Sequence, residues 1–124
     1  MLEVLNAWTA IQGIALLALG AGFGEETFFR GFLQTATISW LSELGGSSLP
    51  YQAATVTGVG AVSLVFGALH AVTPLYFYFA TVSGALFGVE FLTAGLPAAA
   101  VTHSLYDFVA LVYIVNEWGS KKAA

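Results

Sequence analysis

Four long stretches of this 124-residue chain are almost free of charged side chains, and this feature limits the fold more than any other. They cover residues 4–24, 52–71, 75–92 and 98–115. Each stretch has close to the ~20 residues that an α-helix needs to cross the hydrocarbon core of a bilayer. Charged residues make up 8% of the chain, whereas about 25% is usual in a soluble domain. The sequence therefore predicts an all-α, multi-pass integral membrane protein.

The first stretch is followed by a second helical pattern over residues 27–41, which raises a problem of length. A straight helix over residues 4–41 would be about 55 Å long at 1.5 Å per residue, which is too long for one span. Gly20, Gly22 and Gly24 lie between the two patterns, where glycines allow a kink or a close helix contact. We expect a kink or break there, or a first segment that continues outside the bilayer. Residues 1–124 are then one transmembrane domain of four to five helices.

Three ionisable side chains, Glu25, Glu26 and Arg30, lie within six residues between apolar stretches. A charged side chain at the centre of a membrane helix costs ~2.5–3.5 kcal/mol on insertion scales, so the three together need pairing, water or a function. Glu26 and Arg30 have the favoured i,i+4 order of an acid before a base and are expected to pair. Glu25 points about 100° away on a helix and keeps no local partner. The pair alone could be structural, and Glu25 is then the candidate general base.

Both histidines of the chain, His70 and His103, fall inside apolar segments. His103 and Asp107 are four residues apart, so they share one helix face. A single buried histidine is most often a satisfied core residue, but two histidines and two carboxylates from three helices are the ingredients of a hydrolytic site or a metal site. Phe66, one turn before His70, is expected to pack.

Composition excludes several other classes of protein. The chain has no cysteine, so it has no disulfide framework and no thiolate nucleophile. Its net charge is −4 with three basic residues, so no basic surface is expected for nucleic acid. The N-terminus has no basic region, so a cleaved signal peptide is not expected.

Three short motifs, in this order, resemble those of a known family. Residues 25–30 fit EExxxR, residues 66–70 fit FxxxH and residues 103–107 fit HxxxN/D. They are similar to the CAAX-protease and bacteriocin-processing family (CPBP, Abi-type), the relatives of the Ras-converting CAAX prenyl endopeptidase. The resemblance covers roughly residues 16–115 and implies a helical bundle that cleaves peptide bonds inside a water-filled intramembrane cavity.

The resemblance also implies roles for the motif residues. Glu25 would be the general base, and His70 would help to hold and deprotonate the water. His103 and Asp107 would stand where the family places its oxyanion-stabilising or metal-binding pair. The supporting residues would be Glu26, Arg30 and Phe66.

Two departures from the family pattern bear on these roles. Asp107 stands where many relatives have asparagine, and an ionised aspartate cannot donate a hydrogen bond to an oxyanion. It must then be protonated, orient His103 or bind a metal. Glu25, the two histidines and Asp107 would suit a zinc ion with an open water position, although water activation needs no cofactor. Relatives also commonly carry further helices before the acidic motif.

The expected partners are the lipid bilayer and a membrane-embedded or lipidated peptide substrate that enters from the bilayer. Two alternatives belong to other classes of protein. A non-catalytic scaffold or immunity protein of the same family would use the motif residues structurally. A small transporter or proton relay would use Glu25, His70 and His103 to move protons.

Overall fold

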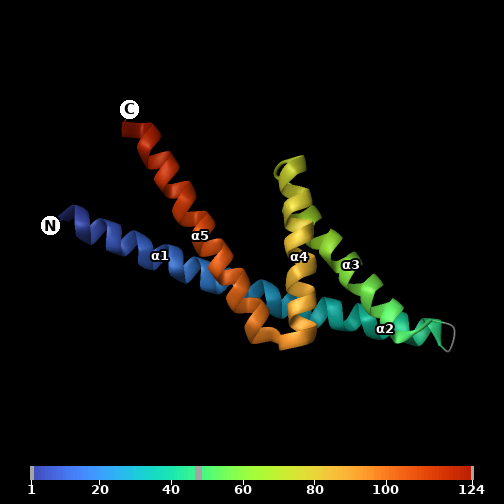
Figure 1. Cartoon of the computed structure of the whole chain (residues 1–124). Coiled ribbons are helices and arrows are strands. Elements are labelled where there is room, and N and C mark those ends of the chain that lie inside the picture. Colours follow the sequence, from blue (N-terminus) through green and yellow to red (C-terminus); the bar gives the residue numbers. More distant parts are fainter. Residues whose placement is uncertain (1, 47–48, 124) are drawn as a thin grey trace.

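The computed structural model describes residues 2–46 and 49–123, and these residues form helices joined by short turns (Figure 1). The elements in chain order are α1 (Leu2–Glu26), the π-helical segment η1 (Thr27–Gln34), α2 (Thr35–Gly45), α3 (Tyr51–Leu69), α4 (Pro74–Ala94) and α5 (Leu96–Ala123). Within the described part of the chain, four helical spans are long and apolar enough to cross a membrane: Asn6–Gly45, Tyr51–Leu69, Pro74–Ala94 and Leu96–Glu117. The prediction of an all-α, multi-pass membrane protein is confirmed.

The first span is one continuous helix through α1, η1 and α2. Of the expected alternatives, a break at the glycines is therefore not found, and a first segment longer than one straight span is. Its 40 residues extend over about 60 Å, which means that the helix is strongly tilted or leaves the hydrocarbon core at one end. In lipid the backbone groups have no partner outside the helix, so glycine alone does not interrupt it. Gly22 instead permits a close helix contact, since a Cβ there would lie 2.8 Å from the Ala100 carbonyl oxygen of α5.

The first span is irregular at η1, where the helix widens to a π-helical turn. The Thr35 hydroxyl donates a 3.0 Å hydrogen bond to the Arg30 carbonyl oxygen, five residues earlier. Short π-helical stretches inside α-helices occur frequently at functional sites. Glu26, Arg30 and Gln34 follow one another at four-residue intervals, and all three are completely buried. The widened turn therefore presents a polar stripe to the interior of the bundle.

The other helices pack around η1, which contacts all of them. In Figure 1, α5 crosses α1, and the two diverge toward the chain termini, while α3 and α4 lie side by side over the other end of the first span. A single residue, Gly95, connects α4 to α5 with a φ of 86°, which glycine adopts without strain. At the other end of α4, Thr73 caps the helix by accepting a hydrogen bond from the Tyr76 N–H at 3.1 Å, with Pro74 in the first helical position.

Burial in this bundle is the reverse of that in a soluble protein. Large apolar side chains face outward, and Leu16, Leu17, Val56, Leu86 and Val109 are each at least 65% exposed. Charged and polar side chains, including those of Glu26, Arg30 and His103, lie inside. This arrangement stabilises a bundle whose surroundings are lipid and whose interior holds a polar site.

Candidate active site

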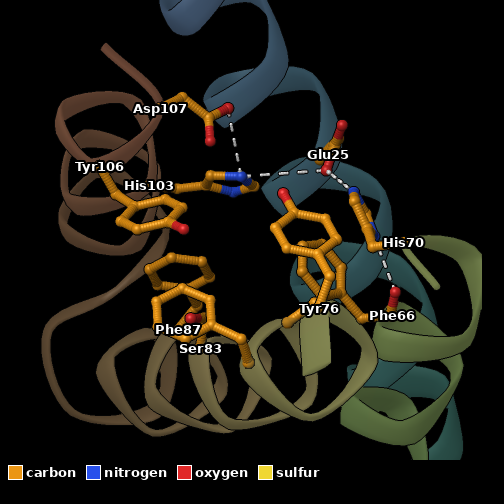
Figure 2. Close-up of a pocket in the computed structure, with 11 residues that line it drawn as sticks. Glu25, Phe66, His70, Tyr76, Ser83, Phe87, His103, Tyr106 and Asp107 are labelled. Atoms are coloured by element: carbon orange, nitrogen blue, oxygen red, sulfur yellow. Dashed lines mark hydrogen bonds and ion pairs between the residues drawn. The ribbon is translucent and has the colours of Figure 1, made fainter. Parts of the chain in front are cut away.

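A cavity of roughly 140 Å³ lies where α1, α3, α4 and α5 meet (Figure 2). Its wall combines aromatic rings with ionisable side chains. The lining residues are Glu25, Phe66, His70, Tyr76, Phe79, Ala80, Ser83, Phe87, His103, Tyr106 and Asp107. The fold thus brings all four residues predicted to carry the chemistry, from three separate motifs, to one cavity.

Glu25 stands at the centre of the polar contacts. Its Oε2 atom is buried and has no hydrogen-bond partner within the described part of the chain. This atom lies 3.6 Å from His70 Nε2 and 3.9 Å from His103 Nε2. Figure 2 shows a continuous series of contacts from Asp107 through His103 and Glu25 to His70. The carboxylate that lacked a local partner in the sequence therefore faces both histidines.

His70 ends α3, and a backbone hydrogen bond fixes its tautomer. Its Nδ1 lies 2.7 Å from the Phe66 carbonyl oxygen. A carbonyl oxygen can only accept a hydrogen bond. The ring proton is therefore on His70 Nδ1, and Nδ1–H donates the hydrogen bond. In the neutral ring, Nε2 is then an unprotonated acceptor that faces Glu25. The phenyl ring of Phe66 also stacks on the imidazole at 4.2 Å, which holds the plane of the ring.

His103 is held by a long-range contact that the sequence did not indicate. Its Nδ1 lies 2.8 Å from Glu26 Oε1, and the other Glu26 oxygen lies 3.1 Å from Arg30 Nε. A carboxylate paired with a guanidinium accepts hydrogen bonds, so Nδ1–H of His103 donates to Glu26. Phe87 stacks on the imidazole at 4.6 Å. These contacts orient Nε2 of His103 toward the cavity, as a hydrogen-bonded neighbour commonly does for a functional histidine.

Asp107 lies one helical turn beyond His103, as its spacing predicted. Its Oδ2 is 3.5 Å from His103 Nε2, beyond the range of a good hydrogen bond. The His103–Asp107 contact is therefore looser than the His103–Glu26 contact. The side chain of Asp107 is 26% exposed, so this carboxylate reaches the cavity.

A second polar layer lies behind the cavity. The Arg30 guanidinium sits 5.8 Å from the ring centre of Phe29 and 5.2 Å from that of Phe66, so two aromatic faces stabilise the part of its charge that Glu26 does not pair. Gln34 donates a 3.1 Å hydrogen bond to the carbonyl oxygen of Gly88. A Cβ at Gly88 would lie 2.6 Å from Gln34 Oε1, so only glycine leaves room for this amide.

The cavity does not have the geometry of a metal site. Among the described residues, no group of three or more His, Cys, Asp and Glu side chains has a geometry that could hold a metal ion. The two carboxylates and two imidazoles are the right kinds of ligand for zinc, but their arrangement does not fit it. We therefore derive no chemical step through a metal.

Several residues of the site were not foreseen from the sequence. Tyr76 and Tyr106, which belong to none of the three motifs, line the cavity together with Ser83 and Phe87. Gln34 belongs to the buried layer and could have been found from its spacing, because it continues the four-residue series of Glu26 and Arg30. Nothing in the pattern of α4 distinguishes its cavity-facing aromatic residues from its lipid-facing ones.

Fold and site together define a class of protein: an all-α membrane protein with a partly open cavity lined by two carboxylates and two imidazoles. Residues 7–109 match the family described as Rce1-like, type II CAAX prenyl endopeptidase Rce1-like. This match spans most of the chain, and the protein belongs to that family. No curated protein and no solved structure matched the chain.

Proposed function

We propose that this protein is an intramembrane endopeptidase that hydrolyses a peptide bond with a water molecule activated by Glu25 and His70. One observation carries the proposal: the buried Oε2 of Glu25, which has no hydrogen-bond partner among the described residues, lies 3.6 Å from His70 Nε2. A single water can lie at about 2.8 Å, an ordinary O–H hydrogen-bond distance, from both of these acceptors. Its two protons would point at Glu25 and His70, which leaves an oxygen lone pair for the substrate.

In the first step, the oxygen of this water attacks the carbonyl carbon of the substrate. Glu25 takes the proton, and the π electrons of the carbonyl move to its oxygen, which becomes an oxyanion. His70 keeps the water oriented through Nε2 because its Nδ1–H is fixed on the Phe66 carbonyl oxygen. Holding the reactants in this way, away from bulk water, is what makes a carboxylate an effective base.

In the second step, the carbonyl forms again, the C–N bond breaks, and the leaving nitrogen takes the proton from Glu25. His103 Nε2 lies 3.9 Å from Glu25 and 3.5 Å from Asp107. A proton on this nitrogen would let His103 donate a hydrogen bond to the oxyanion formed in the first step, and the proton would stay on His103 while the carbonyl forms again. Glu26 and Arg30 hold His103 in position from behind.

The surroundings of the cavity support a lipidated substrate. An apolar groove of roughly 550 Å³ adjoins the cavity and shares Tyr76 and Tyr106 with it. The groove's other lining residues are Val72, Thr73, Ala110, Tyr113 and Ile114. A peptide with a lipidated cysteine would place its lipid in this groove and its scissile bond in the cavity. This arrangement fits the prenylated substrates that the family description implies.

The proposal is tested with purified protein in detergent and a quenched fluorescent peptide, prepared with and without a farnesyl group on its cysteine. The wild type should cleave the farnesylated peptide faster, and Glu25→Gln should lower the rate by about 10³-fold, a loss typical of removing a catalytic base together with the water it orients. A well-folded wild type that cleaves neither peptide would favour a non-catalytic scaffold. Proton flux into liposomes without cleavage would favour the transporter.

A further inference from the structure

The atoms that converge on the centre of the cavity are mainly hydrogen-bond acceptors. Glu25 and Asp107 only accept when ionised. His70 and His103 already donate their Nδ1–H groups, to the Phe66 carbonyl oxygen and to Glu26. Hydrolysis nevertheless requires donors aimed at the oxyanion that forms on the substrate. A proton on His103 Nε2 would supply one donor, and Asp107 as a carboxylate supplies none.

Two phenol groups of the cavity wall can supply the missing donors. Tyr76 comes from the first turn of α4 and Tyr106 from α5, and both line the cavity. Neither hydroxyl makes a hydrogen bond to any described residue. In Figure 2 both rings border the cavity; the Tyr76 hydroxyl points toward His103 and Glu25, and the Tyr106 hydroxyl points into the space between His103 and Phe87.

The backbone at Tyr76 and the ring of Tyr106 are also held in place. The N–H of Tyr76 is bound by the Thr73 cap at 3.1 Å, which fixes the first turn of α4. The ring of Tyr106 packs on that of Phe79 at a centroid distance of 5.7 Å. A donor that is already oriented needs no rearrangement when the oxyanion appears, and this is the condition for effective electrostatic catalysis.

We propose that Tyr76 and Tyr106 are catalytic residues that donate their phenol hydrogens to the oxyanion of the tetrahedral intermediate. The inference rests on the proposed function, because it assigns the donors of that same reaction. The phenols keep their protons: they stabilise the charge while Glu25 holds the proton of the water, and the charge disappears when the C–N bond breaks. In this chain the tyrosines replace the donor that an asparagine at position 107 would provide.

The test compares Tyr76→Phe, Tyr106→Phe and the double variant with Tyr78→Phe as a matched control. Tyr78 lies on the same helix as Tyr76, is 65% exposed and lines neither the cavity nor the groove. With the farnesylated peptide, each single variant should lower kcat at least about tenfold and the double variant about 10²-fold or more. KM should stay within about threefold, because the oxyanion is absent from the bound substrate. Tyr78→Phe should match the wild type.

A binding measurement separates this role from a structural one. A farnesylated peptide trifluoromethyl ketone, whose hydrate resembles the tetrahedral intermediate, should bind the double variant at least about tenfold more weakly than the wild type. Binding of the parent peptide is measured on the Glu25→Gln background, which prevents turnover. The peptide should bind Glu25→Gln and Glu25→Gln with both tyrosine substitutions equally well. Wild-type kcat in the double variant, or a loss confined to KM, would overturn the inference and leave the proposed function standing. A folded wild type that cleaves nothing would overturn both.

Discussion

The buried Glu26–Arg30 pair gives a sharp prediction about stability. Both side chains are completely buried, with 3.1 Å between Arg30 Nε and Glu26 Oε2. Replacing Glu26 with leucine removes the ion-pair partner of the buried guanidinium and the acceptor of the His103 Nδ1–H group. Breaking a buried ion pair by removing one partner costs about 3–5 kcal/mol, and an unpaired buried donor costs about 1–3 kcal/mol. We expect Glu26→Leu to lower the free energy of unfolding by at least about 4 kcal/mol.

The matched control removes both charges in the double variant Glu26→Leu/Arg30→Met. This variant leaves only His103 unsatisfied, so it should be more stable than Glu26→Leu alone by about 2 kcal/mol or more. The measurement is unfolding in mixed micelles with increasing SDS, followed by circular dichroism. A double variant that loses the sum of the two single losses would refute the reasoning, because the charges would then not be coupled.

Three further predictions concern packing, the buried amide and metal dependence. Gly22→Ala should destabilise the protein by about 1–3 kcal/mol, because its Cβ would lie 2.8 Å from backbone atoms of α5. Gly24 has open space around it, so Gly24→Ala should be neutral or stabilising in the same SDS titration. Gln34→Leu should cost about 1 kcal/mol through loss of its hydrogen bond to Gly88, and unchanged stability would show that this bond contributes nothing. Prior treatment with EDTA should leave peptide cleavage within about twofold of the untreated rate, and a loss that zinc restores would contradict the metal-free scheme.

Local spacing revealed those parts of the site that lie on one helix. Glu26 and Arg30 form the predicted ion pair, and Asp107 contacts His103 one turn away. The closest contact of His103 is with Glu26, 77 residues earlier. This contact arises from the packing of α1 against α5, so the spacing of residues within either helix could not predict it.

The glycines show a different limit of sequence reasoning. Gly20, Gly22 and Gly24 allow either a kink or a close contact, and the choice depends on whether another helix approaches. Gly22 meets α5, while Gly20 and Gly24 face open space. Aromatic residues were ambiguous for the same reason, since Tyr76 could equally anchor the helix at the membrane surface or face inward. Their position became clear only from the arrangement of all the helices.

The central claim is that Glu25 and His70 act on the same water, and a double-mutant cycle in kcat tests it most directly. Glu25→Gln, His70→Gln and the double variant are compared with the wild type on the farnesylated peptide, with folding checked by SDS titration. If both side chains hold one water, the double variant should lose no more activity than the worse of the two single variants. Losses that multiply, so that each substitution reduces kcat by the same factor with or without the other, would contradict the account.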